Sequence, residues 1–275
     1  MKIDFEKFSG AKNIFLIREK LNLSTDQLGS LTKKICDPYE GFFADGAVFL
    51  ESLAPGEFKW HFFNSDGSGA EMCGNATRCA HAFVLKKISS AMTKISIQTG
   101  AGTITSESKN DFFHVQMSEP RQKLNLELTT AFFKSANDFE DFKKVASTSA
   151  YFVDTGVPHL VIVVNDWESA LKLKSLWMFL RQHKFFVKGT NVTLIQPGKQ
   201  APTKAISFER GVDDFTQACG TGATAAALYV CDKLAQKNVT VVMPGGQLQV
   251  DFNGKTPTLI GSADYIGQVT TEFKE

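Results

Sequence analysis

Two short segments of this 275-residue chain are near copies of each other. The first is 70–75 and the second is 216–221, and each contains Cys-Gly before an Ala-rich stretch with helical spacing. The two cysteines, Cys73 and Cys219, are separated by 219 − 73 = 146 positions. An internal copy constrains the fold strongly, because both copies must form the same supersecondary unit.

The same offset relates landmarks along most of the two halves. The matched pairs are Gly10 and Gly156, Phe15 and Val161, Asp45 and Asn191, Phe62 and Phe208, and Ala80 and Ala226. A shared offset indicates an ancient duplication with two similar lobes, 1–148 and 149–275, whose boundary falls near the polar stretch 147–149. This division also leaves room for the C-terminal strand to pack with the first lobe. The alternative on pattern alone is two unrelated Cys-Gly turns in an ordinary α/β chain.

Short β-rich runs between turn residues supply the rest of each lobe. The predicted strands are 13–17, 46–50, 59–63, 94–98 and 112–117 in the first lobe, and 160–164, 192–195, 204–208, 239–243 and 247–252 in the second. The predicted helices are 74–87 and 220–235. The expected fold class is therefore α/β (α+β), with two pseudo-symmetric lobes that each wrap a mixed sheet around one central helix.

Composition points to a small-molecule ligand. The formal net charge is +1 and Lys and Arg form no block, which argues against nucleic acid or an anionic membrane surface as the main partner. The chain has no apolar run of membrane-spanning length and no secretory signal, so we expect a cytoplasmic protein. The sequence also allows a homodimer.

The five cysteines favour neither a disulfide framework nor a metal site. An odd number of cysteines in a long chain argues against structural disulfides. Cys73 and Cys79 have no Cys-x-x-Cys spacing and no His pair nearby, so no metal is predicted. Cys36, Cys79 and Cys231 are interpreted as small apolar core residues.

The position of Cys73 and Cys219 at predicted helix starts suggests acid–base chemistry. A helix N-terminus lowers the pKa of a thiol, which makes thiolate accessible at neutral pH. The backbone N–H groups at Gly74-Asn75 and Gly220-Thr221 form sites for a substrate carboxylate. If the two helix starts meet across the pseudo-twofold, one thiolate can remove a proton from a carbon while the opposite thiol returns one. That arrangement inverts a stereocentre.

At these residues the sequence resembles the cofactor-independent amino-acid racemase and epimerase superfamily, and most closely its diaminopimelate epimerase family. The resemblance covers nearly the whole chain and is carried by two motifs, 63–79 and 209–223. It implies two α/β domains with the active site in the cleft between them. It also implies interconversion of L,L- and meso-diaminopimelate, on the route to lysine and peptidoglycan, without pyridoxal phosphate, another cofactor or a metal.

The resemblance also implies roles for individual residues. Cys73 and Cys219 would be the base/acid pair, assisted by His159 for the first thiol and Glu209 for the second. Contacts with substrate are implied for Asn13, Asn64, Asn191, Glu209 and Arg210, in addition to the helix-start residues Gly74, Asn75, Gly220 and Thr221. Arg210 would take the distal carboxylate, because its guanidinium can bind that group through two N–H donors.

Three positions depart from the family pattern: Ile14, the loop 41–45 and Val157, where the family has a polar residue before Pro-His. Val157 bears most on substrate specificity. The runner-up function is therefore a related cofactor-independent racemase or epimerase acting on another amino acid. Two other classes are a thiol-redox protein, which would normally carry Cys-x-x-Cys, and a non-catalytic small-molecule binding protein.

Overall fold

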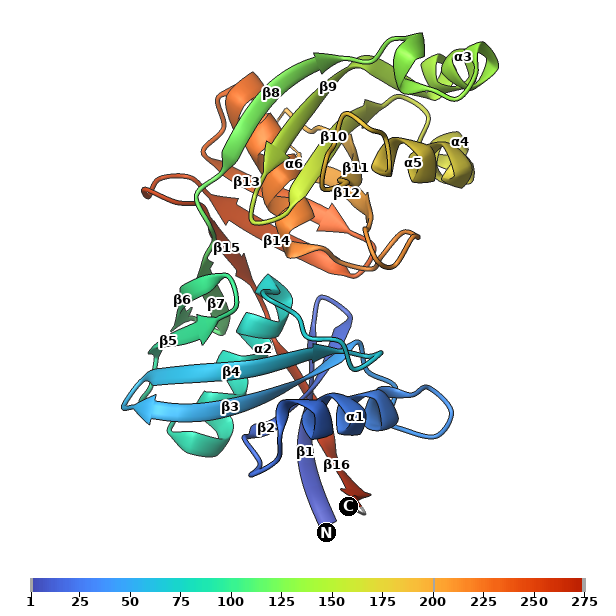
Figure 1. Cartoon of the computed structure of the whole chain (residues 1–275). Coiled ribbons are helices and arrows are strands. Elements are labelled where there is room, and N and C mark those ends of the chain that lie inside the picture. The colour runs from blue at the N-terminus through green and yellow to red at the C-terminus, as the bar shows by residue number, and fades with distance from the viewer. Residues whose placement is uncertain (1, 200, 274–275) are drawn as a thin grey trace. The chain divides into compact units, whose positions relative to one another are not determined.

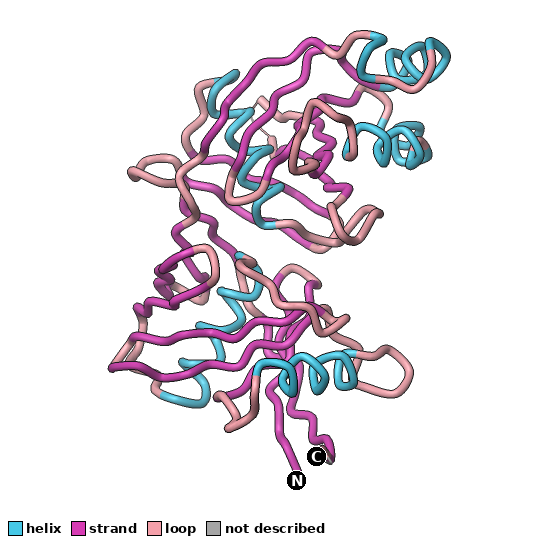
Figure 2. The backbone as a smooth tube through the Cα atoms, in the orientation of Figure 1, coloured by secondary structure: helices cyan, strands magenta, loops and turns pink. Residues whose placement is uncertain are grey.

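The computed structural model describes residues 2–199 and 201–273. It divides into two compact units (Figure 1). The first unit holds the chain up to Gln116 together with the segment from Leu259 onwards, and the second is Met117–Thr258. Each unit contains helices and strands, as the colours in Figure 2 show.

The first unit is built on a mixed sheet. Its strands are β1 (Lys2–Gly10), β2 (Asn13–Glu19), β3 (Gly46–Ala54), β4 (Glu57–Asn64), β5 (Lys94–Thr99), β6 (Gly102–Lys109), β7 (Phe112–Gln116), β15 (Thr258–Gly261) and β16 (Asp264–Glu272). They follow the order β16-β1-β2-β3-β4-β5-β6-β7-β15. β2 is parallel to β3 and β4 is parallel to β5, and the other pairs with an assigned register are antiparallel.

Two helices cover opposite faces of this sheet. α2 (Gly74–Phe83) continues as a π-helical turn over Val84–Ile88, whereas α1 (Thr25–Cys36) lies on the other face. Side chains of a strand alternate between faces, and β2 shows this directly. Phe15 and Ile17 pack with α2, and Leu16 between them packs with α1. The sheet therefore encloses α2 as its central helix.

The second unit repeats this plan. Its strands are β8 (Arg121–Glu127), β9 (Ala146–Asp154), β10 (Pro158–Val164), β11 (Asn191–Gln196), β12 (Thr203–Phe208), β13 (Asn238–Met243) and β14 (Gly246–Asp251), in the order β14-β13-β12-β11-β10-β9-β8. The central helix is α6 (Gly220–Leu234), and the outer helices are α3 (Ala136–Val145), α4 (Trp167–Lys172) and α5 (Lys174–Arg181), with a short 3₁₀ turn at Thr130–Phe132.

Strand directions establish that the two units are copies. β10 is parallel to β11 and β12 is parallel to β13, as β2 is to β3 and β4 is to β5. In both units the pair between these parallel pairs is antiparallel. The predicted α+β class, with two similar halves that wrap mixed sheets around a central helix, is confirmed.

The compact units divide the chain at 116/117 and 258/259, whereas the sequence placed the boundary at 148/149. The difference arises from the last strand of each repeat and from β15, which comes from the second half of the chain and lies in the first unit. β8, the last strand of the first repeat, pairs with β9 in the second unit. β16, the last strand of the chain, pairs with β1 in the first unit. Each unit therefore carries the other repeat's final strand.

Every predicted strand overlaps an observed one, but several elements had no prediction. The predicted helix 74–87 is α-helical only to Phe83, because the last turn widens into a π-helix. α1 starts at a capping box in which Ser24 and Gln27 bond each other's backbone N–H groups. That box was visible in the sequence as Ser-x-x-Gln.

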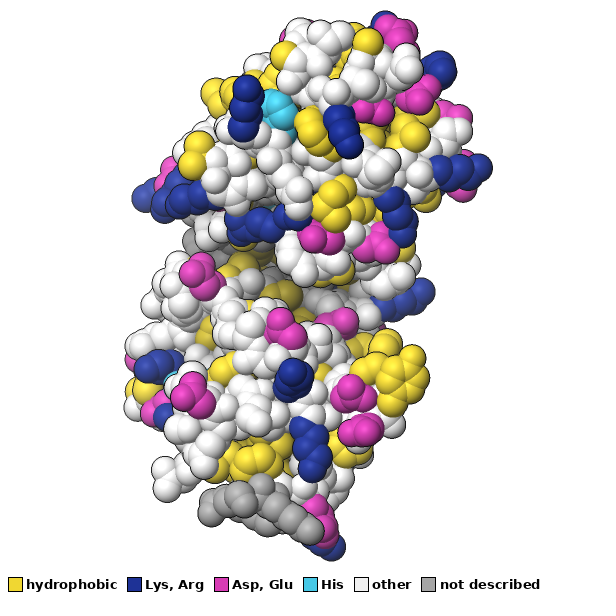
Figure 3. Space-filling view, turned by 45° about the vertical axis from the view of Figure 1, so that its right-hand side comes forward, with side chains coloured by type: hydrophobic (Ala, Val, Ile, Leu, Met, Phe, Trp, Pro, Cys, Tyr) yellow, Lys and Arg dark blue, Asp and Glu magenta, His cyan; other side chains and the backbone are white. Residues whose placement is uncertain are grey.

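The face of the molecule in Figure 3 mixes charges of both signs, with Lys and Arg interspersed among Asp and Glu. This distribution agrees with the formal net charge of +1. None of the helices in residues 2–199 and 201–273 combines the length and apolar character needed to cross a bilayer.

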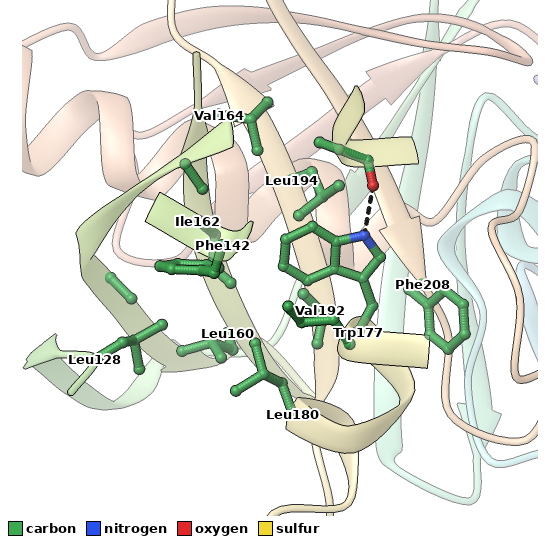
Figure 4. Close-up of a cluster of buried hydrophobic side chains, with 14 of the residues drawn as sticks. Leu128, Phe142, Leu160, Ile162, Val164, Trp177, Leu180, Val192, Leu194 and Phe208 are labelled. Atoms are coloured by element: carbon green, nitrogen blue, oxygen red, sulfur yellow. Dashed lines mark hydrogen bonds between the residues drawn. The ribbon is translucent and has the colours of Figure 1, made fainter. Parts of the chain in front are cut away.

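Trp177 anchors the outer core of the second unit, where α5 packs on β10 and β11 (Figure 4). Its side chain is fully buried and its indole N–H donates to the carbonyl of Ala170 at 2.8 Å. The ring also meets Phe142 of α3 edge-on, with centroids 6.1 Å apart. One residue thus connects three outer helices to the sheet.

Replacing Trp177 by Ala should therefore destabilise the protein by about 3–5 kcal/mol. The change leaves a cavity, and the carbonyl of Ala170 loses its hydrogen-bond donor. Urea unfolding followed by far-UV circular dichroism measures the change. Val187→Ala, at a side chain that is 95% exposed, is the matched control and should stay within about 0.5 kcal/mol. A loss below about 1 kcal/mol for Trp177→Ala would contradict this account of the core.

Candidate active site

Cys73 and Cys219 are the N-cap residues of the two central helices. Both have extended backbone conformations, with φ −149° and ψ 118° at Cys73 and φ −125° and ψ 109° at Cys219. The sulfur of Cys73 accepts the N–H of Ala76 at 3.5 Å, and that of Cys219 accepts the N–H of Gly222 at 3.4 Å. Each sulfur thus takes the place that an oxygen of Ser or Asp usually occupies at a helix start.

This position favours negative charge on sulfur. The first N–H groups of a helix have no acceptor within the helix, and they carry the positive end of its dipole. Gly74 and Gly220 follow the cysteines directly and carry no side chain that could block approach to these donors. Each helix start can therefore stabilise a thiolate and bind a substrate carboxylate at neighbouring N–H groups.

In the first unit, Cys73 lies beside Asn13. The thiol donates towards Oδ1 of Asn13 at 3.9 Å, and Nδ2 of Asn75 donates to the same oxygen at 3.5 Å. Asn13 begins β2 after a two-residue hairpin turn in which Ala11 and Lys12 both have positive φ, 57° and 62°. Such a turn sets the register of the hairpin and so fixes where Asn13 lies.

In the second unit, Cys219 is linked to His159 through Thr221. The sulfur of Cys219 is 3.3 Å from Oγ1 of Thr221, and that oxygen is 2.9 Å from Nε2 of His159. Nδ1 of His159 is in turn 2.9 Å from Oγ1 of Thr193. Oγ1 of Thr193 is also 3.0 Å from Oγ of Ser207. A line of hydrogen bonds therefore runs from the sulfur into the sheet.

The backbone of Arg210 fixes the direction of this line. Its N–H, which can only donate, bonds Oδ1 of Asn191 at 2.7 Å. Nδ2 of Asn191 then donates to Nε2 of His159 at 3.3 Å, so Nε2 is an acceptor and the ring proton is on Nδ1. With Nε2 as acceptor, the hydroxyl of Thr221 donates to it, and the oxygen of Thr221 is left to accept from the Cys219 thiol.

Burial keeps the imidazole of His159 neutral. The side chain is fully buried, and this desolvation, followed by the positive charge of Arg210, lowers its pKa to about 3. A ring with such a pKa is uncharged near neutral pH. The contacts of His159 within its own unit thus make it a fixed hydrogen-bond partner of Thr221.

The loop between β12 and α6 positions Glu209 and Arg210. The hydroxyl of Thr216 donates to Oε1 of Glu209, and the N–H of Glu209 bonds the carbonyl of Asp214 at 3.1 Å. The exposed Arg210 directs NH1 to the carbonyl of Lys188 at 2.6 Å. The loop is fastened further by an ion pair between Arg181 and Asp213 at 2.8 Å.

The predicted site residues therefore fall into two groups, one in each unit. Asn13, Cys73 and Asn75 meet in the first. Asn64, also in the first unit, makes a separate bond from Nδ2 to Oγ of Ser68 at 3.0 Å in the turn after β4.

The second group brings together Cys219, Thr221, His159, Asn191 and the backbone of Arg210. The predicted assistance of His159 to Cys73 and of Glu209 to Cys219 stays a prediction.

The two groups are built at matching positions of the duplication. His159 and Asn13 differ by 159 − 13 = 146 positions, and Thr221 and Asn75 by 221 − 75 = 146. In each unit, the residue at the start of a strand therefore meets the second residue of the central helix. The sequence contained this relation, but only the contacts show that these positions touch.

Sequence reasoning assigned no role to Thr193, Ser207 and Gly222. A Cβ at Gly222 would be 2.2 Å from Oγ of Ser207 and 3.3 Å from the sulfur of Cys219, so glycine is required there. Thr193 and Ser207 looked like ordinary strand residues, because their contact with the site depends on pairing between distant strands.

The remaining cysteines and possible metal ligands are separate from these groups. Cys36 and Cys79 are buried as predicted, whereas Cys231 is half-buried. Burial raises the pKa of the Cys36 thiol to about 12. Within the described part of the chain, no group of three or more His, Cys, Asp or Glu residues is arranged to hold a metal ion.

The orientation of Asn191 makes a testable prediction about His159. At pH 5–7 the ring should be neutral and protonated on Nδ1, because its pKa is about 3 and the amide donates to Nε2. In Asn191→Asp, a carboxylate facing Nε2 should move the proton to that nitrogen and raise the pKa of the ring. Imidazole ¹⁵N chemical shifts report both changes.

Asn125→Asp is the matched control, since Asn125 is exposed on β8 and should leave the His159 signals unchanged. An Nε2-protonated ring in the unsubstituted protein would contradict the assigned direction of the hydrogen bonds.

Comparison with known proteins agrees with the duplicated arrangement. The family model described as diaminopimelate epimerase matches twice, over residues 5–123 and 151–269. The starts of the two matches differ by 151 − 5 = 146 residues, which is the offset between Cys73 and Cys219. Each match therefore covers one repeat and one of the two cysteine-capped helices.

Individual relatives are similar over almost their full length. The diaminopimelate epimerase of Aquifex aeolicus (strain VF5) is 35% identical, covering 91% of this chain and 90% of that protein. That of Carboxydothermus hydrogenoformans is 34% identical, covering 96% and 97%. Among solved structures, a phenazine biosynthesis PhzF-family protein of Enterococcus faecalis shares the fold, with a TM-score of 0.76, 13% identity and coverage of 99% and 100%. On the sequence matches, the chain belongs to the diaminopimelate epimerase family.

Proposed function

We propose that this protein is a diaminopimelate epimerase that interconverts L,L- and meso-diaminopimelate by proton transfer at the α-carbon, without pyridoxal phosphate. Membership of the family and about one-third identity to named epimerases over nearly the whole chain support this function. The observation that carries the proposed chemistry is that Cys73 and Cys219 cap the central helices of two copies of one fold.

The proposed reaction uses one sulfur as base and the other as acid. A thiolate removes the α-proton, so that a C–H bond breaks and an S–H bond forms. The opposite thiol then gives its proton to the other face of the carbon, so that a second S–H bond breaks and the new C–H bond forms. Configuration inverts and the two sulfurs exchange protonation states, with no net oxidation or reduction.

The helix starts would stabilise the intermediate carbanion. Deprotonation next to a carboxylate spreads negative charge onto the carboxylate oxygens. N–H donors at Gly74, Asn75, Gly220 and Thr221 are suited to that charge, because they are fixed before the reaction and sit at positive helix ends. This proposal uses the backbone for charge and the two sulfurs for protons.

The distal end of diaminopimelate requires separate recognition, because it carries its own amino and carboxylate groups. We assign the distal carboxylate to Arg210. A guanidinium has five N–H donors, and the contact of NH1 with Lys188 orients the group while leaving it further donors. Asn13, Asn64, Asn191 and Glu209 are assigned to the remaining polar groups of the substrate.

His159 and Glu209 complete the proposed machinery. Because burial and Arg210 keep the pKa of His159 near 3, we propose that its neutral ring orients Thr221 towards Cys219 and transfers no proton to or from the substrate. The resemblance-based roles, His159 towards Cys73 and Glu209 towards Cys219, are kept as parts of the proposal. A reaction that needs reduced thiols also fits the expected cytoplasmic location.

Loss of either sulfur should stop epimerisation. Cys73→Ala and Cys219→Ala should each lower kcat by at least about 100-fold, because each leaves one face of the carbon without a proton-transfer group. Cys73→Ser and Cys219→Ser should be severely impaired, since an alcohol is a weaker acid than a thiol. Incubation with L,L-diaminopimelate in heavy water, followed by NMR and chiral analysis, measures inversion and deuterium uptake together.

Cys231→Ala is the matched control, because Cys231 is half-buried on the same helix as Cys219 and has no assigned role. It should keep activity within about twofold. Near-normal turnover in Cys219→Ala would rule out the two-sulfur reaction.

Arg210→Met should lower kcat/KM for diaminopimelate by at least about tenfold, because a charge-assisted hydrogen bond contributes roughly 1.5–3 kcal/mol. Arg210→Lys keeps the charge and should lose less. An analogue with the distal carboxylate converted to an amide should be much less sensitive to Arg210→Met. An unchanged kcat/KM in Arg210→Met would contradict the assignment of the distal carboxylate to Arg210. Melting temperatures of the variants check that the loop is intact.

A further inference from the structure

Arg78 is a fully buried guanidinium on α2, five residues after Cys73. Its Nε donates to the carbonyl of Ser262 at 3.0 Å. NH1 and NH2, although buried, have no hydrogen-bond partner among the described residues. A buried cation without neutralising contacts is costly, so its presence calls for a negative charge nearby.

This cation packs against the turn and the helix start that hold Cys73. A Cβ on Gly10 would lie 3.0 Å from the carbonyl of Asn75, 3.1 Å from the sulfur of Cys79 and 3.4 Å from NH2 of Arg78. Gly10 starts the hairpin turn that ends at Asn13, and Oδ1 of Asn13 is 3.9 Å from the sulfur of Cys73. The guanidinium therefore packs against the same turn and helix start that hold the sulfur.

Among the groups that interact electrostatically with Arg78, Cys73 is best placed to supply the negative charge. Burial lowers the pKa of Arg78, and Cys79, Cys73 and Asp264 act in the opposite direction. Burial strongly raises the pKa of Cys79, so that thiol is neutral. Asp264 is exposed on β16, where solvent screens its charge. Cys73, at the N-terminus of the same helix, is therefore suited to carry the balancing charge.

Two other ionisable groups near α2 have partners of their own. His81 bonds Ser106 of β6 and the carbonyl of Met92, and burial lowers its pKa. Oε1 of Glu6 in β1 pairs with Lys87 at 2.6 Å, whereas Oε2 of Glu6 is buried and has no hydrogen-bond partner among the described residues. Lys87 thus supplies the charge opposite Glu6.

The equivalent position in the second unit carries no charge. Position 78 + 146 = 224 is Thr224, which is fully buried and donates its hydroxyl to the carbonyl of Gly220 at 2.9 Å. Beside Cys219 lie the hydroxyl of Thr221 and the neutral ring of His159. Two charges, Glu209 and Arg210, come from the adjacent loop and have opposite signs.

We infer that Arg78 is a positioning residue that makes Cys73 the thiolate and leaves Cys219 as the thiol in the resting enzyme. The inference rests on the proposed function, in which one sulfur must start as base and the other as acid. The two isomers of the substrate then differ, because only the isomer whose α-proton faces Cys73 reacts directly with the resting enzyme. After that turnover Cys219 holds the negative charge, and proton exchange with solvent restores the resting state.

The test is alkylation by iodoacetamide without substrate, with each cysteine followed by peptide mass spectrometry across pH. The midpoint of each pH profile reports thiolate formation, whereas the absolute rate also depends on burial. Cys73 should reach its midpoint at least about one pH unit below Cys219, because Cys73 interacts electrostatically with the buried Arg78 and a nearby opposite charge shifts ionisation by about 1–3 units. Coincident midpoints in the unsubstituted protein would overturn the inference.

Arg78→Gln should raise the Cys73 midpoint by about 1–3 pH units and leave the Cys219 midpoint in place. Arg78→Lys, which keeps a cation, should restore at least half of that shift. Thr224→Val is the matched control at the duplicated position and should not move the Cys73 midpoint. An unchanged Cys73 midpoint in Arg78→Gln would refute the role of Arg78.

The Cys219 profile serves as a control for unfolding of the whole chain, which would move both midpoints together, and the reactivity of the buried Cys79 reports unfolding within the first unit. A shift of both midpoints in Arg78→Gln would therefore assign Arg78 a structural role and overturn the inference. The alkylation readout needs no turnover. If the protein failed to epimerise diaminopimelate but kept the separated midpoints, the proposed function would fail while the assignment of the thiolate stood.

Discussion

The packing of each sheet around one Ala-rich helix is the constraint on which the rest of the structure depends. Small side chains let strands approach α2 and α6 closely, and that enclosure fixes where each helix begins. The residue before each helix has an extended conformation and bonds the first turn. Cys73 and Cys219 bond the first turn through their sulfurs, so the fold that buries each helix also holds a sulfur at its start.

Duplication explains the architecture, and exchange of final strands explains its boundaries. β8 belongs to the first repeat but completes the second unit's sheet, and β16 does the reverse. A constant offset along the sequence identifies the two repeats. It carries no information on which sheet each strand joins. Strand pairing is decided by contacts between distant residues, and β8 itself is polar and mostly exposed, so it carried little hydrophobic pattern.

Local patterns were sufficient to predict much of the fold and the two sulfurs at helix starts. Alternating apolar residues marked the inner strands, and Cys-Gly before Ala-rich stretches marked α2 and α6. The partners of the sulfurs required more. Asn191 reaches His159 only because β10 and β11 pair in parallel register, and the proton position on that ring depends on an amide turned by the backbone of Arg210. No pattern along the chain encodes those non-local contacts.

Equivalent backbones with different side chains give the two halves different chemistry. Asn13 and His159 occupy one duplicated position, and Arg78 and Thr224 occupy another. The first pair sets which hydrogen-bonding group lies near each sulfur, and the second sets whether the central helix carries a buried charge. A symmetrical pair of sulfurs would serve both isomers equally but would leave the starting protonation undefined. Different residues at these duplicated positions can define which sulfur starts protonated, while the two helix starts keep the same backbone.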